Sequence, residues 1–576
     1  MKNLFSCPVS FLAAASLVFL LPWPAARAQA PAWQTAVGQG PINSNGTPNA
    51  NAYIVGASAA DGAGNVYLTG SFAGTASFGS LSLTSLSADD AFVAKYSPAT
   101  GAFLWVRRAG GNATAHVSVA AIGVSGTSVY LAGRFDGPAS IFGSPAQASS
   151  GGDAFVVKLT DAGSSSAFGW VQRSTGGSIN GLEMAVAGAD VYVLGGFQST
   201  ITFGGRFTLT AVPGNTSNNG TVSFLAKFTD VGASGSTRYA GTINGAPKKL
   251  AVNGPNIYVA GVFDGPTVDF GGTVLTNANA QDRDIFIMRL VDAGATASYR
   301  GAQRAGGTGR DRVFGLAATA TGAVVVGDFN GPAAFGTTTL AGGTGLGNYE
   351  AKWNPTSGTF DWAQQSDYFV SGVAVNGLGL YLAGSFRTGT FGGTALTSAG
   401  GGINNDVFVA KFTDAGPGLA FNWVQQAGGT EDDLPAGVSL GGTRVVVQGL
   451  FYSPTAAFGA ISLTRTGSSG VRNDFLASLL DPTLTATAAP AALAGLAVFP
   501  NPAHAATTVR LPAVAGLGQA TLTLLDALGR AVRTQPVPLS ATGTTVDVPL
   551  AGLAPGLYHL RVQAGNQQMS RAVVVE

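Results

Sequence analysis

Residues 64–72 read Gly64-Asn65-Val66-Tyr67-Leu68-Thr69-Gly70-Ser71-Phe72, and this stretch decides the fold because its pattern returns six more times. Successive terminal phenylalanines are 63, 62, 66, 66, 57 and 65 residues apart. Self-similarity at a nearly fixed period is typical of solenoids and propellers. The later copies are Val129–Phe135, Val191–Phe197, Ile257–Phe263, Val324–Phe329, Leu380–Phe386 and Val445–Phe451.

A Phe-Gly pair follows the terminal phenylalanine of every copy within seven residues. Seven repetitions of so specific a pair indicate one structural unit repeated seven times. The pairs are Phe78-Gly79, Phe142-Gly143, Phe203-Gly204, Phe270-Gly271, Phe335-Gly336, Phe391-Gly392 and Phe458-Gly459.

Each copy offers four candidate strands, since β-branched and aromatic runs bounded by turn residues favour strands. The first is the Val-Tyr-Leu run, and the second contains Phe-Gly. The third is of the type Asp90–Lys95, and the fourth carries a tryptophan such as Trp105. Both faces of these strands are largely apolar, as expected for sheets covered on both sides. Four strands per unit is the plan of a propeller blade, so we predict an all-β, seven-bladed β-propeller over residues 31–480.

The seventh copy ends near Leu480 without a tryptophan strand, and the missing strand is found at the start of the chain. Trp33 and Gly38 have the same spacing as Trp105 and Gly110. We therefore predict that this N-terminal strand completes the last blade, which closes the ring and removes an open sheet edge.

The first 28 residues are predicted to be a secretory signal peptide, with Lys2, an apolar run over 11–21 and a cleavage site after Ala28. The chain's one cysteine, Cys7, lies inside it, so the mature chain has no disulfide, thiol catalysis or thiolate metal site. The signal carries two of the 30 basic residues and none of the 29 acidic ones. A mature chain with 28 basic and 29 acidic residues has no bulk charge for nucleic acid, and no later stretch is long and apolar enough for a transmembrane helix.

Residues 481–494 are rich in Pro, Thr and Ala and are predicted to be a linker. Residues 495–576 follow as a second, smaller β domain with short alternating strands, which we expect to be a sandwich. The strand candidates are Thr507–Leu511, Ala520–Leu525, Thr544–Val548, Leu557–Val562 and Ala572–Val575.

The repeat resembles the β-propeller repeats of Bacteroidota often called SBBP repeats. The resemblance is carried by residues 64–72 and by Asp406-Val407-Phe408-Val409-Ala410-Lys411. Copies three and five depart from it, because Val222 and Gly347 replace the aspartate, and copy four has no tryptophan at the matching position. The resemblance implies a propeller in a secreted or surface setting.

The C-terminal region contains Phe499-Pro500-Asn501-Pro502, Leu525-Asp526-Ala527-Leu528-Gly529-Arg530, Leu553-Ala554-Pro555-Gly556-Leu557-Tyr558 and Arg571–Val575. In these segments it resembles the type A sorting domain of the type IX secretion system. The resemblance implies export by the signal peptide, passage across the outer membrane by the secretion machinery, and removal of the tail by a sortase, with the cargo anchored to the surface or released. The sorting-motif residues it assigns are Pro500, Asn501, Pro502, Asp526, Gly529, Arg530, Gly556 and Tyr558.

Catalytic and metal-binding signals are sparse. The three histidines are His116, His504 and His559, and no Gly-x-Ser-x-Gly or His-x-x-x-His pattern accompanies them. We therefore predict no catalytic residues and no required cofactor. The acidic segments 281–284 and 431–433 have oxygen donors for calcium but lack the loop of a calcium hand, so we interpret them as structural turns.

A cation recurs at one position in six copies, and a tryptophan recurs on a strand. The cations could contact an anion or an acidic glycan, but we favour packing and pairing with nearby acids. For the tryptophans we favour core packing over sugar stacking. Lys248-Lys249 is interpreted as a solvated basic pair. The cations are Lys95, Lys158, Lys227, Arg289, Lys352 and Lys411, with Ser478 in the seventh copy, and the tryptophans are Trp33, Trp105, Trp170, Trp362 and Trp423.

These features favour a non-catalytic binding or adhesion module that is secreted or attached to the outer cell surface, with a surface glycan or protein as its partner. Ligands would lie at the loops of one face or at the central channel. A secreted carbohydrate- or peptide-processing enzyme and a structural spacer of a surface layer are the two alternatives, because a fold alone does not specify function.

Overall fold

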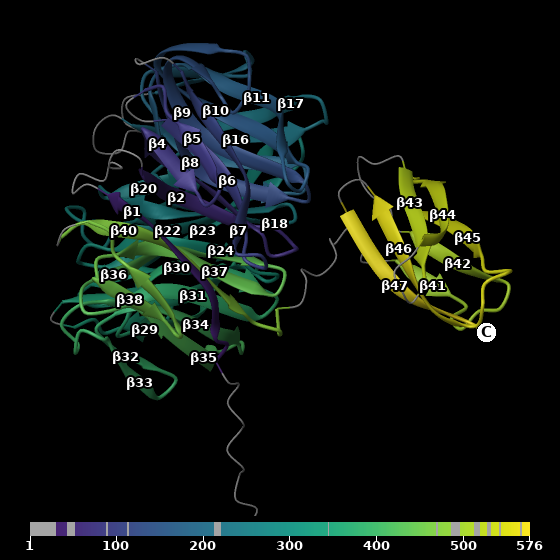
Figure 1. Cartoon of the computed structure of the whole chain (residues 1–576). Helices are drawn as coiled ribbons and strands as arrows, with labels where there is room; N and C mark the ends of the chain where they lie inside the picture. Colours follow the sequence, from purple (N-terminus) through teal and green to yellow (C-terminus); the bar gives the residue numbers. More distant parts are fainter. Residues whose placement is uncertain are drawn as a thin grey trace, which may run out of the picture.

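The computed structural model describes twelve ranges of the chain, and these ranges are all-β (Figure 1). The predicted signal peptide, most of the predicted linker, and Gly529 and Arg530 lie outside them. The described ranges are 30–42, 52–87, 90–111, 115–211, 221–343, 345–467, 470–484, 496–511, 519–526, 531–540, 543–564 and 567–576.

Each repeat forms one unit of four antiparallel strands, which lie side by side in chain order in units 1 to 6, whereas in unit 7 the N-terminal strand takes the fourth place. Unit 1 consists of β2 (Ala52–Ala60), β3 (Val66–Ala73), β6 (Asp90–Ser97) and β7 (Ala102–Gly111). Unit 2 consists of β8 (His116–Ser125), β9 (Ser128–Ser140), β10 (Gln147–Asp161) and β11 (Ser166–Gly176). Unit 3 consists of β12 (Ile179–Ala187), β13 (Asp190–Phe197), β16 (Val222–Asp230) and β17 (Gly235–Ile243).

The remaining units follow the same plan. Unit 4 consists of β18 (Ala246–Asn253), β19 (Asn256–Phe263), β22 (Asp284–Asp292) and β23 (Ala297–Gly307). Unit 5 consists of β24 (Arg312–Ala318), β25 (Ala323–Asn330), β28 (Leu346–Asn354) and β29 (Thr359–Ser366). Unit 6 consists of β30 (Phe369–Asn376), β31 (Gly379–Phe386), β34 (Asp406–Asp414) and β35 (Leu419–Ala427). Unit 7 consists of β36 (Asp433–Gly441), β37 (Arg444–Phe451), β40 (Arg472–Leu480) and β1 (Trp33–Ile42).

The predicted second strand of each copy is wrong. In six copies the Phe-Gly segment forms a short hairpin outside the four strands of its own unit, and the four-stranded unit instead begins with a strand N-terminal to the Val-Tyr-Leu run. These first strands are rich in Ala, Gly, Ser and Val and carry no shared motif, which is why the sequence pattern missed them. The hairpins are β4 (Thr75–Phe78) with β5 (Leu81–Thr84), β14 (Thr200–Phe203) with β15 (Phe207–Thr210), β20 (Thr267–Phe270) with β21 (Thr273–Thr276), β26 (Ala333–Phe335) with β27 (Thr338–Leu340), β32 (Thr388–Phe391) with β33 (Thr394–Thr397), and β38 (Thr455–Phe458) with β39 (Ile461–Thr464).

The recurring Phe-Gly pair has a local explanation. The seven phenylalanines are all buried, at no more than 3% exposure, and they fill the core beside the second and third strands of each unit. Each following glycine has a positive φ, between 54° and 99°, which a residue with a Cβ adopts only with strain. The pair therefore joins a core anchor to the turn of its hairpin.

A Gly-Gly pair at the end of the fourth strand connects neighbouring units. Gly110 and Gly111 of β7 pair with the end of β9 in the next unit. A Cβ on Gly110 would come within 2.1 Å of the Asp90 carboxylate. With the aspartate in place, residue 110 therefore has to be glycine. Units 3 and 5, in which Val222 and Gly347 replace that aspartate, have no such glycine pair. The hairpins that follow them, β20–β21 and β32–β33, are two-stranded sheets, as are β4–β5 and β38–β39.

The units follow one another through their first strands. β2, β8, β12, β18, β24, β30 and β36 contact one another in this order, and β36 also contacts β2. β1 pairs antiparallel with β40, as predicted for the Trp33 segment, so the two ends of the repeat region meet in unit 7 (Figure 1). No single sheet of the described residues closes on itself.

The C-terminal strands form two antiparallel sheets that share one buried cluster, with Val509, Leu524, Leu560 and Val573 near its centre. The predicted strands are present, and β41 and β44 are additional. The first sheet contains β41 (Ala497–Phe499), β42 (Ala506–Leu511) and β45 (Thr544–Pro549), and the second contains β44 (Ala531–Pro538), β43 (Gln519–Leu525), β46 (Gly556–Ala564) and β47 (Gln567–Val575).

A search of the described residues for a helix of sufficient length and apolarity to cross a membrane finds none.

Candidate functional site

The first strands of all seven units carry a β-bulge at the same position. In each strand, pairing with the second strand of the unit skips one or two residues. A bulge takes its residue out of the ladder and redirects the side chain, and bulges are common beside functional sites. The skipped residues vary among the units and are Gly56, Ala120, Gly181 with Leu182, Lys248, Phe314, Ser371 and Ala436.

The bulges of units 3 to 7 line one pocket, which we call the inner-strand pocket. Its volume is about 600 Å³, within the usual range for small-molecule sites. It lies among the first strands of five consecutive units, so no single repeat could form it. Its lining includes Asn180, Gly181, Leu182, Glu183, Thr221, Ser223, Lys248, Lys249, Phe314, Phe369, Ser371 and Ala436.

One side of the inner-strand pocket is aromatic. Phe314 and Phe369 are half-buried and meet edge to face, with ring centroids 4.9 Å apart. The guanidinium of Arg312 lies 5.0 Å from the Phe314 ring and is itself paired with Asp328. This contact holds Phe314 in place and leaves part of its ring available to a ligand.

Another part of the lining is basic. The Lys249 ammonium lies 2.5 Å from Glu183, and both side chains are about one-third exposed. Lys248 is exposed, and no ion-pair partner is found for it in the part of the chain that the structure describes. The sequence predicts only an ordinary solvated pair here, because nothing in the spacing of the two lysines shows that four other units line the same pocket.

The recurring cations lie elsewhere and have a structural role. Lys95 of unit 1 is buried and lies 2.6 Å from Asp161, at the end of the third strand of unit 2. Tyr67 and Trp105 of unit 1 donate hydrogen bonds to the same carboxylate, at 3.1 and 2.8 Å. We call such a set of donors and the acceptor of the next unit an inter-unit lock. Further locks join Lys158 to Asp230, Lys227 to Asp292, Lys352 to Asp414, and Lys411 to Asp481.

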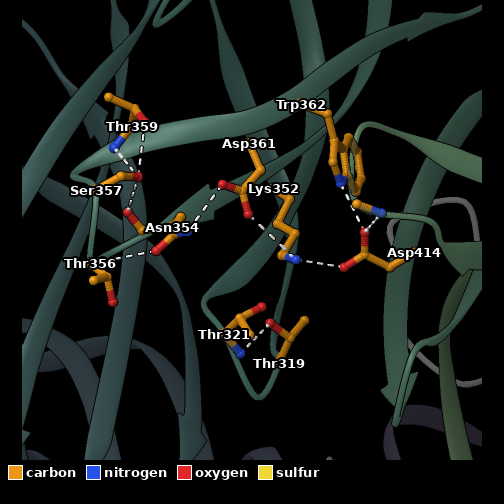
Figure 2. A network of polar contacts seen from close by, with 11 residues as sticks. Thr319, Thr321, Lys352, Asn354, Thr356, Ser357, Thr359, Asp361, Trp362 and Asp414 are labelled. Atoms are coloured by element: carbon orange, nitrogen blue, oxygen red, sulfur yellow. Dashed lines mark hydrogen bonds and ion pairs between the residues drawn. The ribbon is translucent and has the colours of Figure 1, made fainter.

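Figure 2 shows the lock between units 5 and 6. Lys352 contacts the buried Asp414 at 2.6 Å and the more exposed Asp361 at 3.5 Å. The indole nitrogen of Trp362 donates to the other oxygen of Asp414 at 3.2 Å. The packing interpretation of the recurring lysines is thus confirmed for five of them. The tryptophans are also buried, at 4% to 7% exposure, as predicted.

In four of the locks the pKa of the carboxylate is below its usual value. Burial alone would raise the pKa of Asp230, but hydrogen bonds from Lys158 and Trp170 hold it below its usual value. The pKa of Asp414 is lowered in the same way against burial, chiefly by Lys352. A lowered carboxyl pKa means that the charged form is favoured in the folded state.

Two junctions between units have no lock, and donor and acceptor are lost together. Between units 4 and 5, the donor position holds Arg289 and the acceptor position holds Pro355. Between units 7 and 1, these positions hold Ser478 and Pro98. Ser478 instead shares a hydrogen bond with Thr35 of β1 at 2.8 Å.

The acidic segments considered for calcium are engaged within the protein. Asp284 pairs with Arg304, Glu431 with Arg465, and Asp432 accepts from Asn405. Across the described residues, no three Asp, Glu, His or Cys side chains gather in a way that could hold a metal ion.

Two buried carboxylates nevertheless face each other between units 6 and 7. Asp406 and Asp433 are each 1% exposed, and both border the backbone of Gly428. The Oδ1 atom of Asp406 has no hydrogen-bond partner. Burial, with a further contribution from the charge of Asp433, raises the pKa of Asp406 to about 6. Asp284 and Asp311 meet similarly at Gly306, where burial raises the pKa of Asp311 to about 7.

The pair of Asp406 and Asp433 predicts an unusual pH dependence of the protein's stability. Because the folded-state pKa of Asp406 lies above its unfolded value, the stability it contributes is complete below about pH 4 and is lost as the pH rises through about 6. Asp406→Asn cannot lose this proton, so we expect it to exceed the wild type at pH 8 by on the order of 2 kcal/mol. The measurement is the thermal midpoint between pH 4 and 8.

The matched control is Asp90→Asn. Asp90 holds the same place in unit 1 but is paired with Arg108 at 2.7 Å, so its substitution should destabilise the protein and give no gain at high pH. Identical pH profiles for Asp406→Asn and the wild type would contradict the proposed effect of the carboxylate pair.

The two histidines whose side chains the structure describes are not part of a metal-binding cluster. His116 is exposed at the start of β8, and His504 is exposed and contacts the carboxylate of Glu576 at 3.4 Å. The side chain of His559 lies outside the described residues.

The described sorting-motif residues hold the C-terminal domain together. Asn501 accepts a hydrogen bond from the Val574 amide at 2.8 Å, and the Pro500 carbonyl accepts one from Thr507. Pro502 precedes Ala503, whose amide donates to the Val574 carbonyl. The motif thus fixes the first segment of the domain to its last strand.

The second part of the motif lies on the other sheet. Gly556 begins β46, and Tyr558 donates its hydroxyl to the Ala554 carbonyl at 2.9 Å. Asp526 follows β43 directly and is half-buried. Gly529 and Arg530 lie outside the described residues, so their predicted roles stay predictions.

Comparison with protein families gives one match. Residues 497–576 match the secretion system C-terminal sorting domain. This domain indicates export through the type IX secretion system to the cell surface or the extracellular space, and it implies contact with that machinery. Comparison with curated protein sequences gives no match.

Solved structures with distant similarity include two glycosidases. The α-L-arabinofuranosidase Arb93A from Fusarium graminearum, in complex with an iminosugar inhibitor, has 10% identity and a TM-score of 0.31, and the match covers 66% of this chain and 98% of that one. The Trypanosoma rangeli sialidase in complex with 2,3-difluorosialic acid has 10% identity and a TM-score of 0.26, with 78% and 82% covered. At these scores, neither similarity says anything of this chain's activity.

Proposed function

We propose that residues 31–480 form a closed seven-bladed propeller, that the protein is exported by type IX secretion, and that the propeller is a non-catalytic binding or adhesion module on the outer cell surface or outside the cell. The seven four-stranded units support the blade number. The order of contacts from β2 to β36 and back to β2, together with the pairing of β1 with β40, supports closure. The inner-strand pocket then lies on the axis of the ring.

The observation that carries the binding function is the set of seven bulges. The repeat keeps its second and third strands nearly constant, yet its bulged residues vary in size and chemistry, from glycine and alanine to leucine, serine, phenylalanine and lysine. Five of these bulges line the inner-strand pocket. A scaffold that repeats its core and varies one exposed position is suited to presenting a specific set of contacts to one ligand.

The enzyme alternative has less support. Acid–base hydrolysis of a glycoside uses two carboxyl groups that flank the scissile bond. Of the residues that line the inner-strand pocket, Glu183 is the one carboxylate among those described, and it is paired with Lys249. The third candidate, a structural spacer, requires no pocket.

The test is binding of the mature full-length chain to an array of glycans and surface polymers, with and without EDTA. We expect binding that EDTA does not change and that Phe314→Ala weakens at least tenfold. Leu378→Ala, which alters an exposed side chain outside the pocket, should bind like the wild type. The absence of binding to every polymer, or equal binding by Phe314→Ala and Leu378→Ala, would contradict the proposed role of the pocket.

A further inference from the structure

The lysines of the chain fall into two groups. Beyond the predicted signal, five belong to the inter-unit locks, and the remaining two, Lys248 and Lys249, line the inner-strand pocket. Arginine supplies the other basic side chains of the surface. An exposed lysine in this protein is therefore confined to the pocket.

The two pocket lysines differ in electrostatic state. Lys249 is compensated by Glu183 at 2.5 Å. Lys248 is the bulged residue of β18, because pairing with β19 passes from Pro247 to Lys249, and it is exposed with no acidic partner among the described residues. The described lining of the pocket thus has one uncompensated positive charge, and this charge attracts an anionic group.

The rest of the lining adds two kinds of contact. Phe314 and Phe369 offer an apolar aromatic surface on which the C–H face of a sugar can pack. Asn180, Thr221 and Ser371 offer amide and hydroxyl groups to sugar hydroxyls. The Ser371 hydroxyl donates to the Ala383 carbonyl at 3.1 Å and can accept from a ligand. A volume of about 600 Å³ suits a small ligand or the end of a chain.

We infer that the inner-strand pocket binds a carboxylate-bearing sugar, with the carboxylate at Lys248, the apolar ring face at Phe314 and the hydroxyls at the polar side chains. This inference rests on the proposed binding function and names its ligand class. An acidic peptide would also satisfy Lys248, but a lining that combines amide and hydroxyl side chains with an aromatic pair favours a polyhydroxylated ligand.

The first test is calorimetric titration of the mature full-length chain with glucuronic acid, galacturonic acid and their short oligomers, with glucose and galactose as uncharged probes. We expect the acidic sugars to bind at least tenfold more tightly and their affinity to fall with added salt. Lys248→Met should remove this preference. Arg206→Met, which deletes an exposed cation 5.0 Å from a phenylalanine ring outside the pocket, should retain it.

The second test needs no variant. Lys248 is the one exposed lysine of the described residues, so an amine-acylating reagent should modify it faster than Lys249 or the lock lysines. Mass spectrometry should show that glucuronic acid slows acylation of Lys248 and that glucose does not. Equal protection by both sugars would overturn the role of the carboxylate.

The outcomes separate this inference from the proposed function. Tight binding of neutral glycans that depends on Phe314 but not on Lys248 would overturn the acidic-sugar inference and leave the binding function in place. Binding of a poly-glutamate peptide, but of no sugar, in a Lys248-dependent manner would overturn the ligand class. If no probe binds and Phe314→Ala changes nothing on the array, both proposals fall.

Discussion

Replacing Asp414 by alanine is expected to destabilise the protein by about 3–5 kcal/mol, because it leaves the buried Lys352 ammonium without its main partner. The substitution also removes the acceptor of the Trp362 indole N–H. Neither group has access to bulk water, since the side chain of Lys352 is 7% exposed. Urea unfolding of the mature chain measures the loss.

Asp361→Ala is the matched control for this prediction, because it affects the same lysine. Asp361 lies 3.5 Å from Lys352, and its side chain is 26% exposed against 6% for Asp414. A partly exposed ion pair contributes about 0–1 kcal/mol, so the control should be nearly neutral. Equal losses from the two variants would show that the lock is not a buried ion pair in solution.

The second large effect is expected at β1. Trp33 is 7% exposed, donates its indole N–H to the Gln426 carbonyl at 3.1 Å and packs edge to face on Phe458. Trp33→Ala should therefore cost about 3–5 kcal/mol through the cavity and the lost contacts. Deletion of residues 30–42 should have a larger effect, because it exposes the edge of β40 to pairing with other chains.

The control for β1 is Gln34→Ala. This neighbouring side chain is exposed and donates only to the Ala32 carbonyl, so its removal should change stability by less than about 0.5 kcal/mol. Thermal unfolding and size-exclusion chromatography of the mature variants make the comparison. A stable, monomeric chain that lacks residues 30–42 would contradict a structural role for β1.

The sequence predicts the repeated part of the fold, because that part rests on core residues that every unit needs. The Val-Tyr-Leu strand, the Asp-Ala-Phe strand and the tryptophan strand all have strong apolar patterns. The first strands lack such a pattern. Each first strand contacts the first strands of the neighbouring units. A run such as Ala52–Ala60 is rich in small residues and carries no motif.

The inter-unit locks were within reach of sequence analysis. An aspartate stands three residues after the recurring cation in copies two, three, four and six, as in Lys158 and Asp161. The spacing alone does not show that this aspartate pairs with the lysine of the preceding unit, as Asp161 does with Lys95. Where proline replaces the aspartate, at Pro98 and Pro355, the preceding unit has also lost its lysine, and this paired loss within one chain is the signal of the contact.

The inner-strand pocket was out of reach for the opposite reason. Repeat comparison detects what the units share, whereas the bulge residues are informative because they differ. Lys248, Phe314 and Ser371 become neighbours of one cavity only when units 4, 5 and 6 are assembled. No local pattern marks them, and the same is true of the buried pair of Asp406 and Asp433.

The most direct test of the closed ring is a disulfide between its two ends. The mature chain has no cysteine, and Ala36 of β1 faces Ala477 of β40 as a Cα partner, at a separation that a disulfide can span. The control combines Ala36→Cys with Ala94→Cys. Ala94 lies in the third strand of unit 1, at the position that Ala477 has in unit 7. We predict that oxidation links the pair at 36 and 477 within one monomer and leaves the control pair reduced. Linkage of the control pair instead, or disulfides only between chains, would contradict a ring that β1 closes.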